Sequence, residues 1–545
     1  MLQCLVEKMI RSWKCLLYIW ILNFCSKVQA STDPEIVVDL NNEQPGFVTN
    51  NYQQLSNCST YVITVLNFNP NVKFFIIQVH SFHENLTLSY ENPVNTNSFT
   101  SGQNIGLVWM QQFSTKFGSL NNNSVNFYLF RRGTILNNLD ILLSVSTYAE
   151  NDPVPGGCNL SFETEIAPYQ KITTSSNTIT VLSQPPSIFE SLCDRSDIQT
   201  DMYFLYLKEH NNNADEYFRG IEQMMSPANI TKYGTRVIEA LTSTKFKQMY
   251  SRYAGTGRVF AIVSTYKNKT SAYVPTVSYS CDLHLWEEDC LGPNGVYWKL
   301  VTAFLLVCGL ILCFVGHRLF KISLFIIGYT FGVFIMLIVL TVDDDFNETG
   351  KTVYALVMGG FFAITWVFLW WKFGVPVIAV ELTFLLSGFI LSSIIFYSPL
   401  GNIMTFATDG TFWILFATII LLLQIPLVCL KSSYNIVALS LIGSYAFVVA
   451  MNFYFGGYLP YIFINMYRRM IVKDFGLAVI DPPYEMMDIA QTILWILIFG
   501  IGIFVQYKYS IGKPPFPPHR NIVVLNILNE RTPLLIGEQP PAYSA

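Results

Sequence analysis

The fold of the second half of this chain is decided by stretches such as YWKLVTAFLLVCGLILCFVGHRLFKISLFIIGYTFGVFIMLIVLT, residues 297–341. Two apolar segments, 297–316 and 322–341, flank a short polar turn. Roughly 20 apolar residues in an α-helix, rising about 1.5 Å each, cover the ~30 Å hydrocarbon layer of a bilayer. Each segment is therefore predicted to cross a membrane once.

Five more segments of this length follow, which gives seven predicted spans. The five are 352–371, 375–397, 412–430, 434–455 and 487–507. Only 13% of the residues are charged, whereas a soluble protein carries about 25%. We predict a membrane protein whose all-α seven-helix transmembrane domain, residues 297–507, follows a β-rich extracellular or lumenal domain. The basic residues are scattered, so no nucleic-acid partner is expected.

The first 30 residues have the features of a secretory signal peptide. Basic residues at positions 8, 11 and 14 precede a short apolar core, 15–24, and residues 28–30 have the small-residue form of a cleavage site. That core is too short to span a bilayer. Cleavage of residues 1–30 is expected, and the alternative is an uncleaved anchor that would add an eighth span.

Asparagine-linked glycosylation sequons indicate the sidedness of the chain. Six lie in residues 31–296 and a seventh lies between the second and third spans; they begin at Asn57, Asn85, Asn122, Asn159, Asn229, Asn268 and Asn347. Such acceptors belong to surface loops of secreted regions. The N-terminal domain is therefore predicted to lie outside, with the C-terminus in the cytosol.

The positive-inside rule supports the same orientation. The turns assigned to the cytosol contain basic residues, namely Arg318, Lys321, Lys372 and Lys431. The exception is the outside loop 456–488, which contains Arg468, Arg469 and Lys473. The preceding segment, 461–467, is either a short amphipathic helix on the outer membrane surface or part of a plain folded loop.

The outer domain divides into two β-rich, sandwich-like modules. The first, residues 31–167, alternates β-branched and aromatic runs with turn residues; its predicted strands are 61–66, 73–80, 105–110, 125–130 and 140–146. The second, residues 168–296, has a predicted helix at 215–225 and predicted strands near 259–266 and 271–279.

Five cysteines remain outside the membrane after signal cleavage, in a compartment that favours disulfides. Cys58 lies within a sequon and is our choice for the unpaired one. The remaining four can pair in three ways, and the sequence leaves all three open; they are Cys158, Cys193, Cys281 and Cys290.

The first six spans form three predicted hairpins, each turning in the cytosol at a basic residue. The second helix of each contains glycine: Gly328 and Gly332, then Gly388, then Gly443. The pattern indicates either a weak threefold repeat, as in some transporters, or the ordinary packing of short-looped hairpins, which we favour. Glu381 is the one acidic residue well inside a span, and it is either a proton or cation site or a neutral, hydrogen-bonded carboxyl.

Eight strings, taken in order, resemble the transmembrane 7 superfamily member 3 family. They are DPVPGGCNLSF (152–162), GHRLFK (316–321), WWKFG (370–374), SPLGN (398–402), DGTFW (409–413), IGSY (442–445), FPPH (516–519) and ERTPLL (530–535). The resemblance covers the outer domain, the spans and the tail. It implies a signal peptide, a glycosylated outer domain, seven spans and a cytosolic C-terminus, and it supplies no catalytic residue and no ligand. It also implies that Cys158, Cys193, Cys281 and Cys290 are the family's outer cysteines, whereas Glu381 matches no acid in its pattern.

The tail, residues 508–545, ends in two short motifs. An acidic residue four positions before a leucine pair fits a signal for clathrin adaptors; here these are Glu530, Leu534 and Leu535. A PPxY sequence fits the aromatic groove of WW domains; here its residues are Pro540, Pro541 and Tyr543. Clathrin adaptors and WW-domain ubiquitin ligases are therefore the predicted partners of the tail.

The sequence contains no signature of a hydrolase, a phosphate-binding loop or a metal-ligand cluster, so no enzyme activity, cofactor or metal is predicted. We predict a non-enzymatic glycoprotein with a receptor-like or protein-interaction role, routed by its tail between the plasma membrane and the endolysosomal system. Its extracellular ligand is unidentified. The alternative is a transporter or channel that uses the membrane domain with Glu381.

Overall fold

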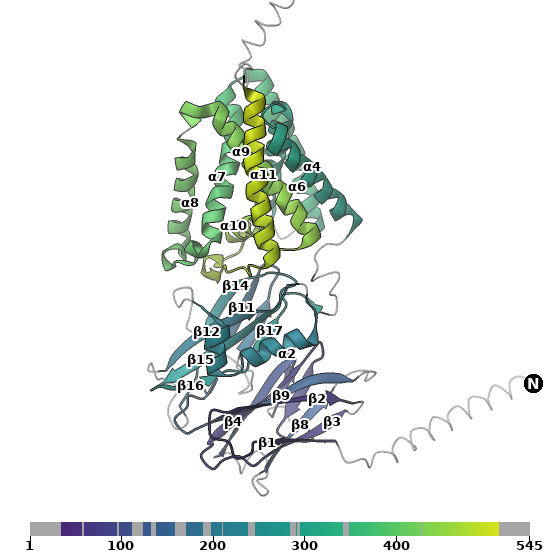
Figure 1. The fold of residues 1–545 in the computed structure, drawn as a ribbon, viewed down its shortest axis with the longest axis vertical. Coiled ribbons are helices and arrows are strands. Elements are labelled where there is room, and N and C mark those ends of the chain that lie inside the picture. The colour runs from purple at the N-terminus through teal and green to yellow at the C-terminus, as the bar shows by residue number, and fades with distance from the viewer. Residues whose placement is uncertain are drawn as a thin grey trace, which may run out of the picture.

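The structure, a computed structural model, describes residues 34–56, 59–94, 98–111, 124–131, 138–158, 170–188, 198–209, 211–237, 246–283, 290, 295–341, 348–425 and 427–511. The β-strands of the N-terminal half lie at one end of the molecule and a bundle of helices lies at the other (Figure 1). The predicted signal peptide, 1–30, and both tail motifs fall outside the described residues, as do Asn57, Cys58, Asn122, Asn159, Cys193 and Asn347.

The first β module is a sandwich of two sheets. Its strands are β1 (Glu35–Asp39), β2 (Val48–Leu55), β3 (Thr60–Leu66), β4 (Phe74–Ser81), β5 (Leu86–Ser89), β6 (Phe99–Gly102), β7 (Asn104–Met110), β8 (Ser124–Arg131) and β9 (Leu139–Tyr148). One sheet has the order β1-β3-β8-β5-β6 and the other β2-β9-β4-β7. Alternate residues, such as Ile63, Val65 and Phe127, point into the core between the sheets.

The second β module is also a two-sheet sandwich. Its elements are β10 (Gln170–Thr174), β11 (Thr178–Ser183), β12 (Gln199–Tyr206), α2 (Ala214–Gln223), α3 (Pro227–Tyr233), β13 (Thr235–Arg236), β14 (Lys247–Ser251), β15 (Arg258–Tyr266), β16 (Lys269–Ala272) and β17 (Thr276–Ser278). A short strand from far along the chain, β18 (Ala478–Val479), joins one sheet, whose order is β10-β11-β14-β18. The other has the order β13-β12-β15-β16, with β17 also paired to β15.

The sequence-based prediction of two β-sandwich modules is confirmed. The five strands predicted in the first module are β3, β4, β7, β8 and β9, and the predicted helix is α2. Val154 pairs with Ser187 and packs in the core of the second module, so residues upstream of the predicted boundary near 167 already lie with that module. β4 is buried on both faces, because Phe75 fills the first core while Phe74 packs against the second.

The helices that follow are α4 (Val296–Val315), α5 (Phe320–Thr341), α6 (Glu348–Phe373), α7 (Pro376–Tyr397), α8 (Asp409–Gln424), α9 (Leu427–Phe455), α10 (Tyr461–Ile471) and α11 (Met486–Ser510). In the described part of the chain, six of them are long and apolar enough to cross a membrane: α4, α5, α6, α7, α9 and α11. They match six of the seven predicted spans.

The fifth predicted span, 412–430, differs from the prediction. α8 has 16 residues, and at 1.5 Å per residue its length of about 24 Å is less than the ~30 Å hydrocarbon layer. α9 begins at Leu427, so the predicted turn at Lys431 is wrong: that residue lies within a helix. The sequence reason is Pro426, since proline has no amide hydrogen to continue the helix that ends at Gln424.

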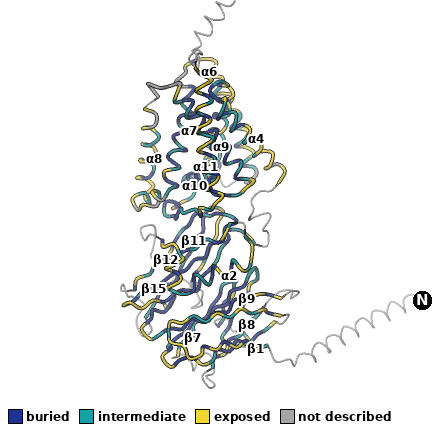
Figure 2. The backbone as a smooth tube through the Cα atoms, viewed as in Figure 1, coloured by how far each residue is buried: buried dark blue, intermediate teal, exposed yellow. Residues whose placement is uncertain are grey.

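Glycines determine which membrane helices pack together. α5 packs on α6, where a Cβ on Gly332 would lie 3.1 Å from the Cα of Gly359. α4 packs on α9, where a Cβ on Gly443 would lie 2.4 Å from the backbone nitrogen of Cys313. α7 and α9 are the central helices, each with 67% of its span residues buried, compared with 17% in α6 (Figure 2). The predicted hairpin partners α4 and α5 thus pack mainly on other helices.

Candidate functional site

The second β module is joined to the membrane helices by a continuous set of contacts, which we call the junction. Three segments of the membrane domain form it: the turn 456–460 after α9, α10, and the loop 472–485 before α11. β18 lies in that loop and pairs in parallel with β14, which lies at the helix-facing end of the module (Figure 1). A strand of the membrane domain therefore completes a sheet of the β module.

α10 shows that 461–467 is helical, which was one of the two alternatives, but the buried face of this helix contacts protein. Ser251 Oγ donates to Asn465 Oδ1 at 2.7 Å. Arg468 Nη1 donates to Ser251 Oγ at 3.0 Å and to the Arg252 carbonyl at 2.7 Å. Arg468 is only 6% exposed, and burial lowers the pKa of its guanidinium. This basic residue, which departs from the positive-inside pattern, holds the β module on the membrane domain.

The next residue, Arg469, ties α10 to the start of α8. Its Nη2 lies 3.3 Å from Asp409 Oδ1, and its guanidinium carbon lies 3.6 Å from the ring centre of Phe412. Lys473, the third basic residue of the loop, is exposed. The three cations predicted to lie together on one loop therefore have different surroundings.

The Gly456-Gly457-Tyr458 turn is bonded both to the second β module and to α11. The Gly457 amide donates to Glu209 Oε1 of the β module at 3.0 Å, and the Tyr458 amide donates to Asp488 Oδ1 of α11 at 2.6 Å. Gly457 has φ +121°, and a Cβ there would lie 2.6 Å from Asn452 Nδ2 and 2.9 Å from Asp488 Oδ1. Only glycine suits this position, since an L side chain would be strained and would clash.

A buried cation lies behind the turn. Arg258 is 2% exposed, and its guanidinium carbon lies 4.4 Å from the ring centre of Tyr206. Four further rings lie within 5.2–5.9 Å of it: Phe204, Tyr250, Tyr253 and Phe260. Cation–π attraction stabilises a guanidinium in such a cage. The Tyr206 hydroxyl accepts from Arg258 and donates to the Asp481 carbonyl, so the cage is bonded to the loop before α11.

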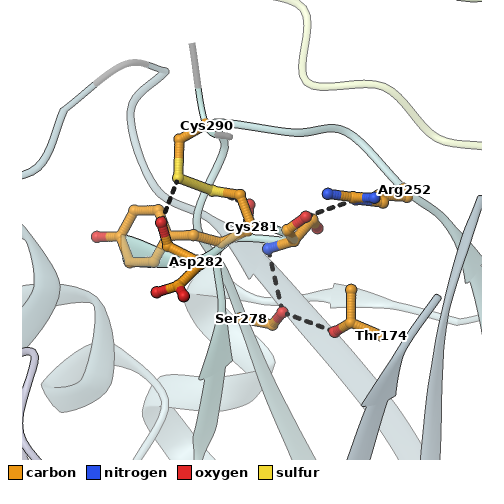
Figure 3. Close-up of a disulfide and its surroundings, with 8 residues drawn as sticks. Thr174, Arg252, Ser278, Cys281, Asp282 and Cys290 are labelled. Carbon is orange, nitrogen blue, oxygen red and sulfur yellow. Dashed lines mark hydrogen bonds between the residues drawn. A yellow bond between two sulfur atoms is a disulfide. The ribbon is translucent and has the colours of Figure 1, made fainter. Parts of the chain in front are cut away.

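A disulfide closes the second module next to the first membrane helix. Cys281 is bonded to Cys290, a pairing that was among the predicted alternatives (Figure 3). Nearby, Arg252 Nε donates to the Ser280 carbonyl, and the Ser280 amide donates to Ser278 Oγ at 3.2 Å (Figure 3). Cys158 is also disulfide-bonded. The segment that leads from the second module toward α4 is therefore held next to β14.

Three of the predicted glycosylation sites lie on described residues, and all three are exposed: Asn85, Asn229 and Asn268. Asn268 has φ +66° in the turn between β15 and β16. Each asparagine is therefore open to an oligosaccharyltransferase.

We expect each of these three asparagines to carry a glycan, because each is an exposed acceptor in a predicted lumenal domain. Asn229→Gln and Asn268→Gln should each remove one glycan-sized mass step on gels of the cellular protein. Asn212→Gln is the control, since Asn212 is exposed but begins no sequon. Insensitivity of the wild-type mass to endoglycosidase would contradict the predicted orientation.

Glu381 lies on α7 and is half-buried. It belongs neither to the junction nor to any group of three or more His, Cys, Asp or Glu side chains able to hold a metal, and no such group occurs among the described residues.

The acidic residues that the fold does bring together are Glu209, Glu485 and Asp488, which sequence reasoning missed. The available signals were the Gly456-Gly457 pair after a span and the two acids that begin the next one.

Comparisons with known proteins agree with this architecture. Residues 41–132 match the family described as "TM7SF3-like, N-terminal immunoglobulin-like domain" and residues 153–284 match its second immunoglobulin-like domain. Residues 302–507 match the TM7S3/TM198-like domain. These are not known enzyme families.

Curated relatives cover most of the chain. The chain is 29% identical to transmembrane 7 superfamily member 3 of Homo sapiens over 465 residues, which are 82% of this chain and 80% of the human protein. It is 28% identical to the Mus musculus protein over 483 residues, which are 86% of this chain and 84% of the mouse protein. The predicted resemblance is confirmed across the outer modules and the membrane helices: this chain is a multi-pass membrane protein similar to transmembrane 7 superfamily member 3.

Proposed function

We propose that the chain is a non-enzymatic, receptor-like glycoprotein whose immunoglobulin-like modules bind a protein partner outside the cytosol. The observation that carries the proposal is the junction. Because β18 completes a sheet of the second module and Arg468 is buried against it, the outer modules are held firmly on the membrane helices. Such docking suits a protein in which binding at the outer modules changes the membrane domain.

The contacts continue from the junction into the helices. The Tyr397 hydroxyl of α7 donates to the Tyr458 carbonyl at 2.8 Å, and Asn452 of α9 donates to Gln491 Oε1 of α11 at 3.0 Å. One turn deeper, Trp495 Nε1 of α11 donates to Ser444 Oγ of α9 at 3.1 Å. A displacement of the second module would therefore strain hydrogen bonds in α7, α9 and α11. Within a membrane an unpaired polar group is costly, so these helices would have to move with the module.

The partner proposal is tested on intact cells that express the full chain with a labelling enzyme at its mature N-terminus. We expect a discrete set of extracellular proteins to be labelled, and the same proteins to bind the purified full chain in nanodiscs. Labelling indistinguishable from that of an unrelated multi-pass glycoprotein at equal surface level would overturn the proposal. The transporter alternative has less support, since Glu381 is remote from the junction and the first predicted hairpin is not a packing unit.

The tail motifs are proposed to route the protein through endosomes. Leu534→Ala with Leu535→Ala should raise the surface level severalfold, because adaptor capture needs the leucine pair. Tyr543→Ala should lengthen the lifetime of the protein, because a WW domain of a ubiquitin ligase loses its aromatic anchor. Surface biotinylation and pulse-chase measure both.

Matched tail controls are Leu525→Ala with Leu528→Ala for the leucine pair and Ser544→Ala for the tyrosine. The leucine control removes the same kind of side chain outside the dileucine motif, and Ser544→Ala changes the residue next to Tyr543. Both controls should leave surface level and lifetime unchanged. If the motif variants also leave both unchanged, the tail is not a routing signal.

A further inference from the structure

Two carboxylates from different regions of the protein bind neighbouring amides of one turn. Glu209, at the end of the strand–loop segment after β12, accepts from the Gly457 amide at 3.0 Å, while Asp488 of α11 accepts from the Tyr458 amide at 2.6 Å. Because the two amides are consecutive along the backbone, the docked β module places one carboxylate beside another.

A third carboxylate faces the same place. Glu485 Oε1 accepts from the Glu209 amide at 2.9 Å, and Glu485 and Asp488 form a capping box at the start of α11. The Glu209 side chain lies near these two acids from α11 and near the Tyr458 phenol of the turn. The neighbouring Lys208 is exposed. Arg258 lies against the ring of Tyr206, whose hydroxyl donates to the Asp481 carbonyl.

We propose that Glu209 makes the docking of the second β module on the membrane helices sensitive to pH, so that the junction is tighter in an acidic compartment than at neutral pH. The proposal rests on the proposed orientation only for its physiological setting, because an acidifying lumen must bathe the β modules. It does not depend on the identity of any protein partner.

The direction follows from the surroundings of Glu209. Burial, together with the negative charges of Asp488 and Glu485, raises its pKa from the ordinary 4.5 to about 7, although the Gly457 amide opposes the rise. In an undocked module the side chain would return to water and to its ordinary pKa. Docking therefore takes up a proton. The protonation of Glu209 favours docking most fully when the pH is below the ordinary pKa of 4.5, and this contribution is lost as the pH rises through about 7.

The size of the effect follows from the same two values. Between pH 7.5 and 5.5, a carboxyl whose pKa changes from 4.5 to about 7 on docking strengthens docking roughly 20-fold. A glutamine at this position would keep an oxygen acceptor for the Gly457 amide and would remove the charge. Glu209→Gln thus separates a pH-sensing role from a plain hydrogen-bonding role.

The experiment follows amide hydrogen exchange of β18, residues 478–479, in the full chain in nanodiscs. Wild type and Glu209→Gln are compared at the same pH, so the intrinsic pH dependence of exchange cancels. We expect the exchange rate of the wild type, divided by that of Glu209→Gln, to rise roughly 20-fold between pH 5.5 and pH 7.5. Glu43→Gln, on the exposed surface of the first module, should show no such difference.

A ratio of exchange rates that stays constant from pH 5.5 to 7.5, or that changes in the opposite direction, would overturn the proposal. A second variant guards against a folding defect in the first. Glu485→Gln keeps the acceptor of the Glu209 amide and removes one facing charge, so it should move the wild-type transition to lower pH. If the transition does not move, the group that titrates is not Glu209. None of these results depends on a partner or on the tail, so failure here leaves the proposed function standing.

Discussion

Replacing Arg468 by alanine is expected to weaken docking of the second β module by about 2–4 kcal/mol. The buried guanidinium donates to Ser251 Oγ and to the Arg252 carbonyl. Hydrogen bonds from a charged donor are worth roughly 1.5–3 kcal/mol each, and truncation leaves a buried acceptor unpaired. At 1.4 kcal/mol per tenfold, hydrogen exchange in β14 should accelerate by roughly 30-fold or more.

The matched control is Lys473→Ala, which removes an exposed cation from the segment just after α10. It should change exchange in β14 little, because exposed charges contribute about 0–1 kcal/mol. If Arg468→Ala behaves like Lys473→Ala, the junction is not held through α10. The comparison is made in the full chain in nanodiscs, with β4 of the first module as the internal reference.

Local patterns in the sequence identified five of the nine strands of the first module, and they offered a helix as one of two alternatives at α10. The β-branched and aromatic runs marked five strands of the first module, and the unbroken run in β4 fits a strand buried on both faces. The spacing of apolar residues in 461–467 indicated an amphipathic helix. It did not indicate what the apolar face meets, because the same pattern suits a lipid surface and a protein surface.

The junction was not predictable from the sequence because its parts are far apart along the chain. Glu209 lies 248 positions before Gly457 and 276 before Glu485, so their contacts depend on the whole fold. β18 has two residues and is a strand only because β14 lies beside it. Glu381 is conspicuous in the sequence because it interrupts an apolar run. Glu485 and Asp488 lie at the start of the last apolar run, where acidic residues are common as helix caps.

The shortened α8 shows the limit of counting apolar residues. The run 412–430 is apolar enough for a span, yet hydropathy does not register that Pro426 interrupts it. Length arguments therefore need helix-terminating residues as well as composition. The glycines, in contrast, were identified from the sequence, and their packing partners required the fold.

Gly443→Ala is expected to destabilise the membrane domain by about 1–3 kcal/mol or more, as overpacking does in a close-packed interior. A Cβ there would lie 2.4 Å from the nitrogen and 2.9 Å from the Cα of Cys313, and 2.6 Å from the carbonyl oxygen of Gly309. All three are backbone atoms of α4, so no side-chain rotation can relieve the contact and the two helices must separate. Separation would also weaken the bonds from Gln506 Nε2 of α11 to Ser440 Oγ at 3.1 Å and to the Cys313 carbonyl at 2.7 Å.

Gly500→Ala provides a control of opposite sign on the neighbouring helix α11. A Cβ at Gly500 would meet nothing within 4 Å, and alanine is favoured over glycine within a helix by roughly 0.5–1 kcal/mol. Gly443→Ala should therefore lower, and Gly500→Ala should preserve or raise, the temperature at which the detergent-purified full chain loses its monodisperse elution peak. Equal temperatures for the two variants would mean that α4 and α9 do not pack through Gly443, because the same methyl group would then have the same effect at a crowded helix crossing and at an open surface.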